Sequence, residues 1–284
     1  MNRFLTLVVL LTFLLCDVKA QTTKPSTKKK VKLPPHTGYF DLNLQMGVPM
    51  QEYSTATQSL PFGFNFGYMH QPSRYVPLLI GGDFSYMSVG TNTIDRALTA
   101  DITANGVLID QLFIPLQFQI NNNLITSHLK LRFLAPTKYV KPYIDGIGGF
   151  NYLWTGTQVF DRSQQQFFAR NNNNDNGLIT RNTQLQSFTY SAGAGTGLLF
   201  QLKPNFYLNV GVCYAFGGRA NYYDNSQIQN WDIQLNTSGY NPNQTNGAFK
   251  DSDLYVDAIP KRSKTDMLLI QLGFSWNVVD GKYK

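Results

Sequence analysis

The chain has 284 residues, of which 14% are aromatic and 14% are charged, and its formal net charge is +7. Soluble proteins carry about 25% charged residues, so this composition argues against a surface that faces water everywhere. The basic residues gather in an N-terminal segment without interleaved aromatic side chains, which argues against nucleic-acid binding. No later stretch has 18 unbroken apolar residues, so we expect no spanning helix. A soluble exported protein or a membrane β-barrel remains.

Residues 1–20 have the pattern of a secretory signal peptide. A basic start precedes an apolar run over residues 4–15, and small residues precede a cleavage site after Ala20. Cys16 lacks the small preceding residue of a lipoprotein cysteine, so we interpret it as part of the signal; a lipid anchor is the alternative. Cys213 is then the only cysteine of the mature chain, which excludes an internal disulfide.

Residues 21–37 are rich in Lys, Thr and Pro and show no apolar period, so we expect a disordered periplasmic arm. Its solvated lysines would keep the chain soluble during export. Alternatively, they contact anionic lipid head groups, cell wall or a partner protein. The basic residues of this arm are Lys24, Lys28, Lys29, Lys30 and Lys32.

Apolar residues alternate with small or polar residues over 38–279, the pattern of strands whose successive side chains face opposite sides. The apolar face is continuous and aromatic, and the other face is small and polar, which suits lipid outside and a narrow lumen inside. Gly193, Gly195 and Gly197 share the polar face and no helical spacing follows, so they are not a phosphate loop. The predicted strands lie near residues 40–48, 60–68, 78–86, 107–134, 144–154, 188–202, 206–216 and 268–278.

The connections alternate between short and long, which is typical of an outer-membrane barrel. We predict an all-β, antiparallel up-and-down transmembrane barrel of eight strands. One segment, 107–134, is too long for a simple strand, and its apolar parity flips around Asn121–Asn123. Either a bulge redirects one long strand, or two strands lie here and the barrel has ten. The short connections lie near 71–75, 135–140 and 203–205, and the long ones near 90–106, 157–186 and 220–265.

Several stretches resemble the outer-membrane-protein β-barrel domain family common in Bacteroidota, which is related to OmpA-, OmpX- and PorT-like small barrels. They are "LFIPLQFQI" (112–120), "VKPYIDGIGGFNYLW" (140–154), "LKPNFYLNVGVCYAF" (202–216) and the closing "LLIQLGFSWNV". The resemblance covers about 39 to 279 and implies the fold and an outer-membrane location of a Gram-negative cell. The polar tail 280–284 departs from the family pattern, which ends on an aromatic strand.

The face assignment places charged side chains inside the barrel. An eight-stranded barrel has room for side chains but not for a water channel, and a buried charge is costly unless it is paired. We therefore predict an ion network that plugs the lumen, with Lys130 across from Asp145. A selectivity ring in a small pore is the alternative. The predicted network comprises Lys130, Arg132, Asp145, Asp83, Asp41 and His128.

No motif for catalysis or metal binding stands out. His128 points inward but Ser127 outward, and we find no Ser–His–acid set on one face, so we expect no enzyme. His36 and His70 lie outside the lumen, and zinc-type Cys/His spacing is absent. Oxygen-rich loop segments lack the full calcium-loop pattern, and no cofactor is expected.

The last long loop is rich in aromatic residues, which suggests a contact surface; a loop folded back on itself or at the lipid boundary is the alternative. The sequence predicts a structural or accessory subunit of an outer-membrane complex. Its expected partners are outer-membrane lipid, lipopolysaccharide and other outer-membrane or periplasmic proteins. A small pore or solute-binding barrel is the alternative, followed by a lipid-modifying enzyme. The loop aromatics are Tyr222, Tyr223, Trp231, Tyr240 and Tyr255.

Overall fold

The computed structural model describes residues 37–55, 57, 59–73, 75–104, 107–162, 177–223, 229–236, 251–257 and 260–279. The predicted signal peptide, most of the arm and the polar tail lie outside these ranges. No helix within them is long and apolar enough to cross a membrane. Thr37 already belongs to the first strand, one residue before the predicted start of the barrel. The arm lysines outside the described residues are Lys24, Lys28, Lys29, Lys30 and Lys32.

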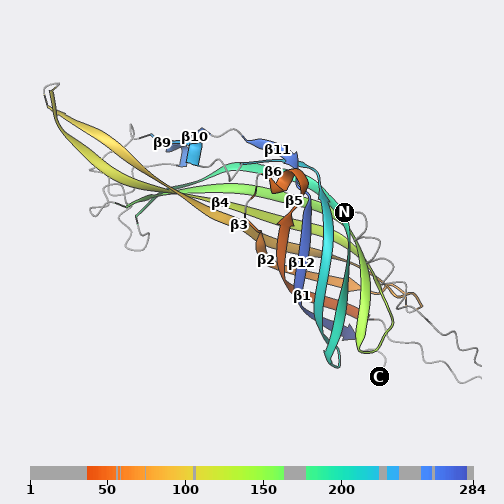
Figure 1. Cartoon of the computed structure of the whole chain (residues 1–284). Helices are drawn as coiled ribbons and strands as arrows, with labels where there is room; N and C mark the ends of the chain where they lie inside the picture. Colours follow the sequence, from red (N-terminus) through yellow and green to blue (C-terminus); the bar gives the residue numbers. More distant parts are fainter. Residues whose placement is uncertain are drawn as a thin grey trace, which may run out of the picture. The chain divides into compact units, whose positions relative to one another are not determined.

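Eight antiparallel strands form a closed barrel in the order β1-β12-β7-β6-β5-β4-β3-β2 (Figure 1). Each strand pairs with its neighbours along the chain, and β1 closes the ring against β12. The prediction of eight strands is confirmed, because residues 107–134 form one strand. The barrel strands are β1 (Thr37–Pro49), β2 (Phe62–His70), β3 (Leu78–Ala104), β4 (Val107–Leu134), β5 (Val140–Asp161), β6 (Leu178–Lys203), β7 (Phe206–Gly217) and β12 (Met267–Val279).

Short turns join the strands at one end of the barrel, called here the turn end. The longer connections β1–β2, β5–β6 and β7–β12 lie at the opposite, loop end. The predicted long connection 220–265 contains short strands: β8 pairs with β11, and β9 pairs with β10. These pairs leave fewer free backbone groups than an irregular loop would. The loop-end elements are α2 (Gln51–Ser54), β8 (Arg219–Tyr222), β9 (Asp232–Leu235), η2 (Asp251–Asp253), β10 (Leu254–Asp257) and β11 (Lys261–Lys264).

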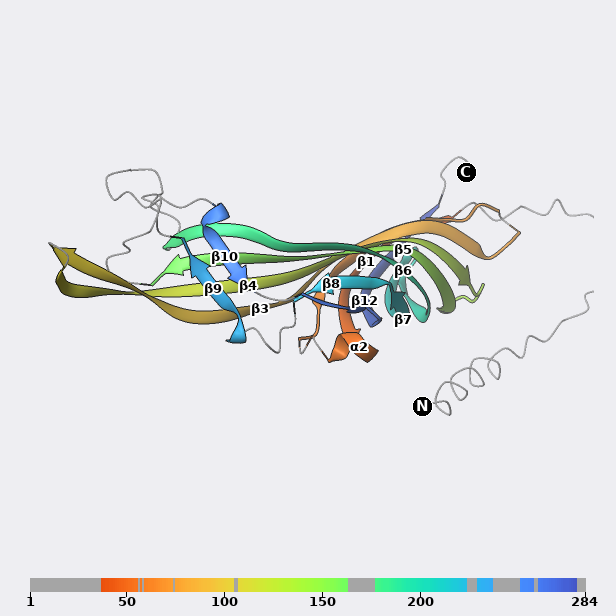
Figure 2. The same ribbon diagram turned by 90° about the horizontal axis from the view of Figure 1, so that it is seen from above.

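Strands β3, β4, β5 and β6 have 22 to 28 residues, whereas the other four barrel strands have 9 to 13. A tilted strand needs about 9–11 residues to span a bilayer. The four long strands therefore continue the barrel sheet past the loop end as a four-stranded part, called the extension (Figure 2). Much of the predicted loops 90–106 and 157–186 is thus strand, which corrects the sequence interpretation. The extension comprises 90–104, 107–122, 155–161 and 178–185.

The parity flip in β4 comes neither from a bulge in this strand nor from a second strand. Even-numbered residues of β4 face inward along its whole described length, from Ile114 to Leu134, so β4 contains no bulge that redirects it. The register shift lies in its partner β3, between Ser88 and Gly90, where Gly90 has φ +123°. Apolar residues change from the outer to the inner face because the surroundings of the sheet change at the loop end.

The outer face of the barrel carries exposed apolar side chains on every strand, as predicted. Leu131 and Phe133 of β4 are each 52% exposed. Aromatic rings gather toward both ends: Tyr86 and Trp154 lie 6.0 Å apart near the loop end, and Phe206 and Trp276 lie 5.2 Å apart near the turn end. An apolar band between two aromatic girdles is the outer surface of a membrane barrel.

Candidate functional site in the barrel lumen

Side chains fill the lumen in three layers. An aromatic and aliphatic layer closes the turn end, polar and charged residues occupy the middle, and a second apolar layer closes the loop end. The turn-end layer is Tyr39, Met69, Leu79, Leu134, Tyr143, Leu199 and Tyr207. The loop-end layer includes Tyr53, Met87, Val89, Leu124, Leu153, Tyr222, Met267 and Leu269.

Arg132 is the centre of the charged layer and is fully buried. It faces Asp145 across the β4–β5 pair and binds it bidentately, with Nε–Oδ1 2.7 Å and Nη2–Oδ2 2.8 Å. Its Nη1 donates to Asp41 Oδ2 at 3.1 Å, and its Cζ lies 3.7 Å from the ring centre of Tyr143. Ser275 donates a further hydrogen bond to Asp41. Bidentate pairing and ring stacking satisfy a guanidinium in a way that a lysine could not.

Asp83 is the second centre. Its Oδ2 lies 2.6 Å from Lys130 Nζ, and its Oδ1 lies 3.1 Å from His128 Nδ1. Lys130 also lies 3.9 Å from Asp145, which links the two centres into one cluster. The cluster contains two permanent cations, Lys130 and Arg132, and three carboxylates, and the His128 imidazole is hydrogen-bonded to one of these carboxylates.

The predicted pairing of Lys130 opposite Asp145 is wrong by two residues. Partners on β4 and β5 have numbers that sum to 277, so Arg132 faces Asp145 and Lys130 faces Ile147. Leu134 and Tyr143 are the last pair before the turn. The turn between paired residues is therefore two residues longer than the predicted connection 135–140. The structure nevertheless brings all six residues of the predicted network into one buried layer.

A serine missed by the sequence analysis joins this layer. His128 Nε2 lies 3.1 Å from Ser191 Oγ on β6, so Asp83, His128 and Ser191 form a Ser–His–acid set. Asp83, His128, Gly149 and Ser191 occupy one row of paired positions across β3 to β6. Gly149 has no side chain, so the imidazole reaches across β5. Carrying the strand register over two neighbours would have revealed this row.

Burial limits the access of a substrate to this Ser–His–Asp set. Ser191 is 2% exposed, His128 5% and Asp83 8%, and the apolar layers close both ends of the lumen. A nucleophile needs a position where a substrate carbonyl can approach it. No such approach to Ser191 exists among the described residues, and Asp83 is already shared with Lys130. The set therefore serves as part of the hydrogen-bonded filling.

Uncharged polar residues continue the filling toward the loop end. Asn43, Asn65, Asn209 and the Tyr143 hydroxyl form a chain with contacts of 2.8 to 3.2 Å. A second chain joins Gln271, Gln45, Ser85 and Thr126, with contacts of 2.6 to 3.1 Å. Buried polar groups cost free energy unless they are hydrogen-bonded, and these networks satisfy them. Asn151 is an exception, because neither atom of its amide has a partner.

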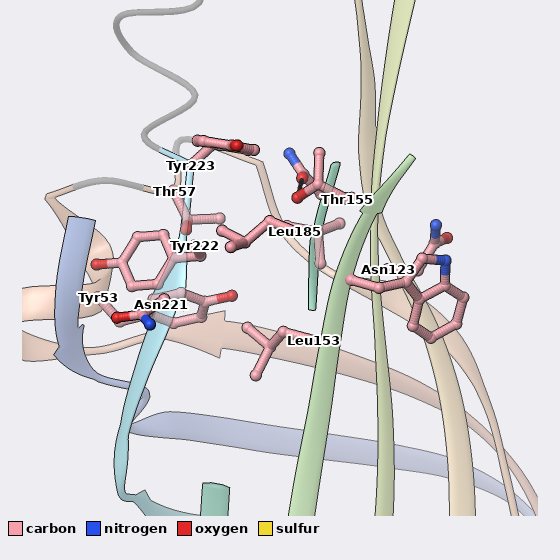
Figure 3. A pocket seen from close by; sticks show the side chains of 12 residues that line it. Tyr53, Thr57, Asn123, Leu153, Thr155, Leu185, Asn221, Tyr222 and Tyr223 are labelled. Atoms are coloured by element: carbon pink, nitrogen blue, oxygen red, sulfur yellow. Dashed lines mark hydrogen bonds between the residues drawn. The ribbon is translucent and has the colours of Figure 1, made fainter. Parts of the chain in front are cut away.

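The cavities within the filling are small. One beside Lys130, Gln45 and Cys213 has a volume of about 10 Å³. A second, at the loop end, has about 20 Å³ and lies among Tyr53, Leu153 and Tyr222 (Figure 3). Each holds one water molecule or two at most. Neither is wide enough for a solute path.

Three of the predicted contact aromatics are buried, which contradicts their assignment to an exposed surface. Tyr222, Tyr223 and Trp231 are 6%, 8% and 6% exposed, whereas Tyr255 is 59% exposed and Tyr240 lies outside the described residues. The loop folds back onto the sheet because packing there removes the apolar surface of the three rings from water.

The buried loop aromatics seal the loop end and cover the extension. The ring of Tyr222 packs edge-on against Tyr53 at 5.1 Å, and Tyr223 packs against Trp231 at 4.6 Å. Burial raises the pKa of Tyr53 to about 12 and also raises the pKa of Tyr223.

The remaining candidate residues do not assemble into a site. Cys213 faces the lumen as a free, half-buried thiol, and His70 ends β2 at the turn end. His36 lies outside the described residues. Within the described ranges, no group of three or more His, Cys, Asp or Glu residues is arranged to hold a metal ion.

Comparisons with known proteins give structural similarity only. No family model matches the sequence, and no curated protein matches it. The attachment invasion locus protein Ail of Yersinia pestis is 12% identical over 86% of this chain and 99% of its own, with TM-score 0.33. Neisserial surface protein A is 10% identical over 86% and 97%, with TM-score 0.35. AlkL, an outer membrane protein, is 11% identical over 92% and 99%, with TM-score 0.33.

Proposed function

We propose that this protein is a non-conducting, non-enzymatic outer-membrane barrel that acts as a structural or accessory subunit of a larger outer-membrane complex. The observation that carries this proposal is the lumen, which is filled from end to end by two apolar layers and a paired ionic layer. A transport function needs a continuous polar path, and catalysis needs an accessible reactive group.

The exposed apolar band supports the membrane location. Short turns in outer-membrane barrels lie in the periplasm and long loops outside the cell. By this rule the turn end is periplasmic, and α2, β8 to β11 and the extension are extracellular. Membership of the Bacteroidota barrel family remains a prediction that rests on the sequence resemblance.

Planar-bilayer recording tests the closed lumen. We expect no reproducible single-channel steps from the purified full-length protein, because the filling leaves only water-sized cavities. Insertion is checked independently by protease protection of the barrel in the same lipid. Regular conductance steps from inserted protein would favour the alternative of a small pore and would overturn the proposal.

The extension offers the contact surface for a partner. The pairing of β2 with β3 ends at Ser88, whereas β3 continues to Ala104, so no described residue pairs with this edge of β3 beyond Ser88. An open strand edge is a template for pairing with another chain. We place the partner contact on β3 from Gly90 to Ala104, in place of the buried loop aromatics.

Photo-crosslinking distinguishes an edge contact from a face contact. Thr93 on the edge strand and Gln119 on β4 are cross-strand neighbours on the same outer face. A photoreactive residue at Thr93 should capture a discrete partner in native membranes, and one at Gln119 should capture it weakly. Equal capture at both positions would indicate a partner that covers the face. Capture at neither position, with the barrel emerging alone from solubilised membranes, would remove the subunit role.

A further inference from the structure

A hollow of about 590 Å³ lies on the outer wall of the barrel, away from the lumen and the extension. It crosses β1 to β5 and is bounded by outward-facing side chains that include Phe40, Tyr68 and Phe150. Its volume falls within the range of about 300–1,000 Å³ that is usual for ligand pockets. This hollow is called the trough.

Two outward-facing glycines form the floor of the trough. Tyr68, Gly82, Leu129 and Gly148 are consecutive partners in one row across β2 to β5. Leu129 therefore stands alone between two positions without side chains and is 77% exposed. Most other outward positions of the barrel carry large side chains, so the two glycine positions on either side of Leu129 are local depressions in the apolar band.

Aromatic rings form the wall of the trough on the loop-end side. Phe66 and Phe84 are neighbours with ring centres 5.2 Å apart, and Phe150 continues their row beyond Ser127. Asp83 and His128 also border the trough, but their side chains are bonded to lumen residues. The outer lining is therefore apolar, with the hydroxyls of Tyr68 and Ser127 as its polar groups.

We propose that the trough binds one acyl chain of a phospholipid from the periplasmic leaflet as an ordered site on the barrel. The proposal rests on the membrane location proposed above. Five strands at about 4.8 Å spacing make the trough about 19 Å across, so it can hold one extended acyl chain, whose length is set by a hydrocarbon leaflet of roughly 15 Å. Phe40 and Tyr68 lie within four residues of the turn end of their strands, so the β1–β2 end of the trough lies in the periplasmic half.

The shape of the trough favours a chain over a protein surface. A methylene chain on the glycine floor contacts the wall on several sides, and many small dispersion contacts add up. The rings that protrude on its border hold a flat protein surface away from the glycines. Neighbouring parts of the apolar band lack this concavity, so lipid contacts them on one side only.

A glycine substitution fills the trough without disturbing the barrel. A Cβ atom at Gly148 meets no atom within 4 Å, so Gly148→Leu places a side chain in the trough without a backbone clash. Gly146 is the matched control, because it faces outward on the same strand, has equally open space and does not line the trough. Ser127→Leu fills the trough from β4 and replaces Gly148→Leu should that variant fail to assemble.

The test measures dimyristoylphosphatidylcholine retained per barrel by native mass spectrometry after extraction from nanodiscs into mild detergent. We expect one retained phospholipid on wild type and Gly146→Leu, and about tenfold lower occupancy for Gly148→Leu and Ser127→Leu. Equal retention in all four proteins, or equal loss in Gly146→Leu, would overturn the proposal. Loss of a co-purified protein from the trough variants, with lipid retention unchanged, would make the trough a protein interface instead. A barrel that does not enter the nanodiscs at all would contradict the membrane location. Insertion without a retained phospholipid would contradict only the lipid site, so the two failures can be told apart.

Discussion

The two halves of β4 show opposite patterns on the same pair of faces. In the barrel half, inward residues include His128, Lys130 and Arg132, and the outward residues from Leu129 to Phe133 are apolar. In the extension half, the inward residues Ile114, Leu116, Phe118 and Ile120 are at most 3% exposed, and their outward neighbours at 115, 117, 119 and 121 are Pro, Gln, Gln and Asn. The strand keeps its orientation while its surroundings change.

This inversion shows that the solvent decides which face of a strand is apolar. Lipid surrounds the barrel half, so apolar side chains point out and polar ones can pair inside. Water surrounds the extension, so its apolar side chains point in and pack against Trp231, Ile233 and Leu254 of the loop. The point where the parity of apolar residues flips therefore marks the boundary of the membrane at the loop end.

The largest effect is expected from the inner face of the barrel half. Arg132→Met leaves Asp41 and Asp145 buried without their cation, and removing one partner of a buried pair costs about 3–5 kcal/mol. We expect that loss in the free energy of unfolding, measured by urea titration of tryptophan fluorescence in vesicles. The control replaces the whole group, Arg132→Met with Asp41→Asn and Asp145→Asn, and should recover most of the stability. A single variant as stable as wild type would show that the ionic layer is not tightly buried.

The inner face of the extension half should respond to a change in packing. Phe118 is 1% exposed, so Phe118→Ala leaves a cavity and costs about 3–5 kcal/mol. We expect the loss to be local: amide hydrogen exchange should rise in the extension and stay unchanged in β1, β7 and β12. Phe133→Ala is the control, because lipid fills the space of an outward side chain. Unfolding of the whole barrel by Phe118→Ala would mean that the two halves are one cooperative unit.

The barrel could be predicted from sequence because alternate residues of a membrane strand point to lipid and to the lumen, so the alternation of apolar and polar residues identifies both faces. Placing Lys130 and Arg132 inside follows from parity alone. The exact pairing of Arg132 with Asp145 does not, because a turn that differs by two residues shifts every partner. Ser191 required the register of three strands together. The extension was hidden because its inverted parity looks like a break in the strand.

A charge added to the outer face should lower the free energy of unfolding more in the barrel half than in the extension half. The difference should be smaller than the two effects above. Leu131 and Gln119 both face outward on β4, one in the apolar band and the other in the extension. Leu131→Arg should cost about 1–4 kcal/mol, depending on its depth in the bilayer, whereas Gln119→Arg should stay within about 0.5 kcal/mol. Urea titration in vesicles measures both. Equal costs would contradict the assigned membrane boundary.

The smallest effect concerns the junction of the two halves, where Tyr53 closes the loop end. Burial raises its pKa to about 12 in the folded protein, against about 10 for an exposed tyrosine. The neutral hydroxyl is therefore favoured by folding, so this contribution is fully present below pH 10 and is lost as the pH rises toward 12. Between pH 10 and 12, the free energy of unfolding of wild type should fall by on the order of 2 kcal/mol more than that of Tyr53→Phe. Urea titration at each pH measures it. Tyr255→Phe is the matched control, because this tyrosine is exposed and should follow wild type. Parallel pH curves for wild type and Tyr53→Phe would show that water reaches Tyr53 and that the loop-end layer is open.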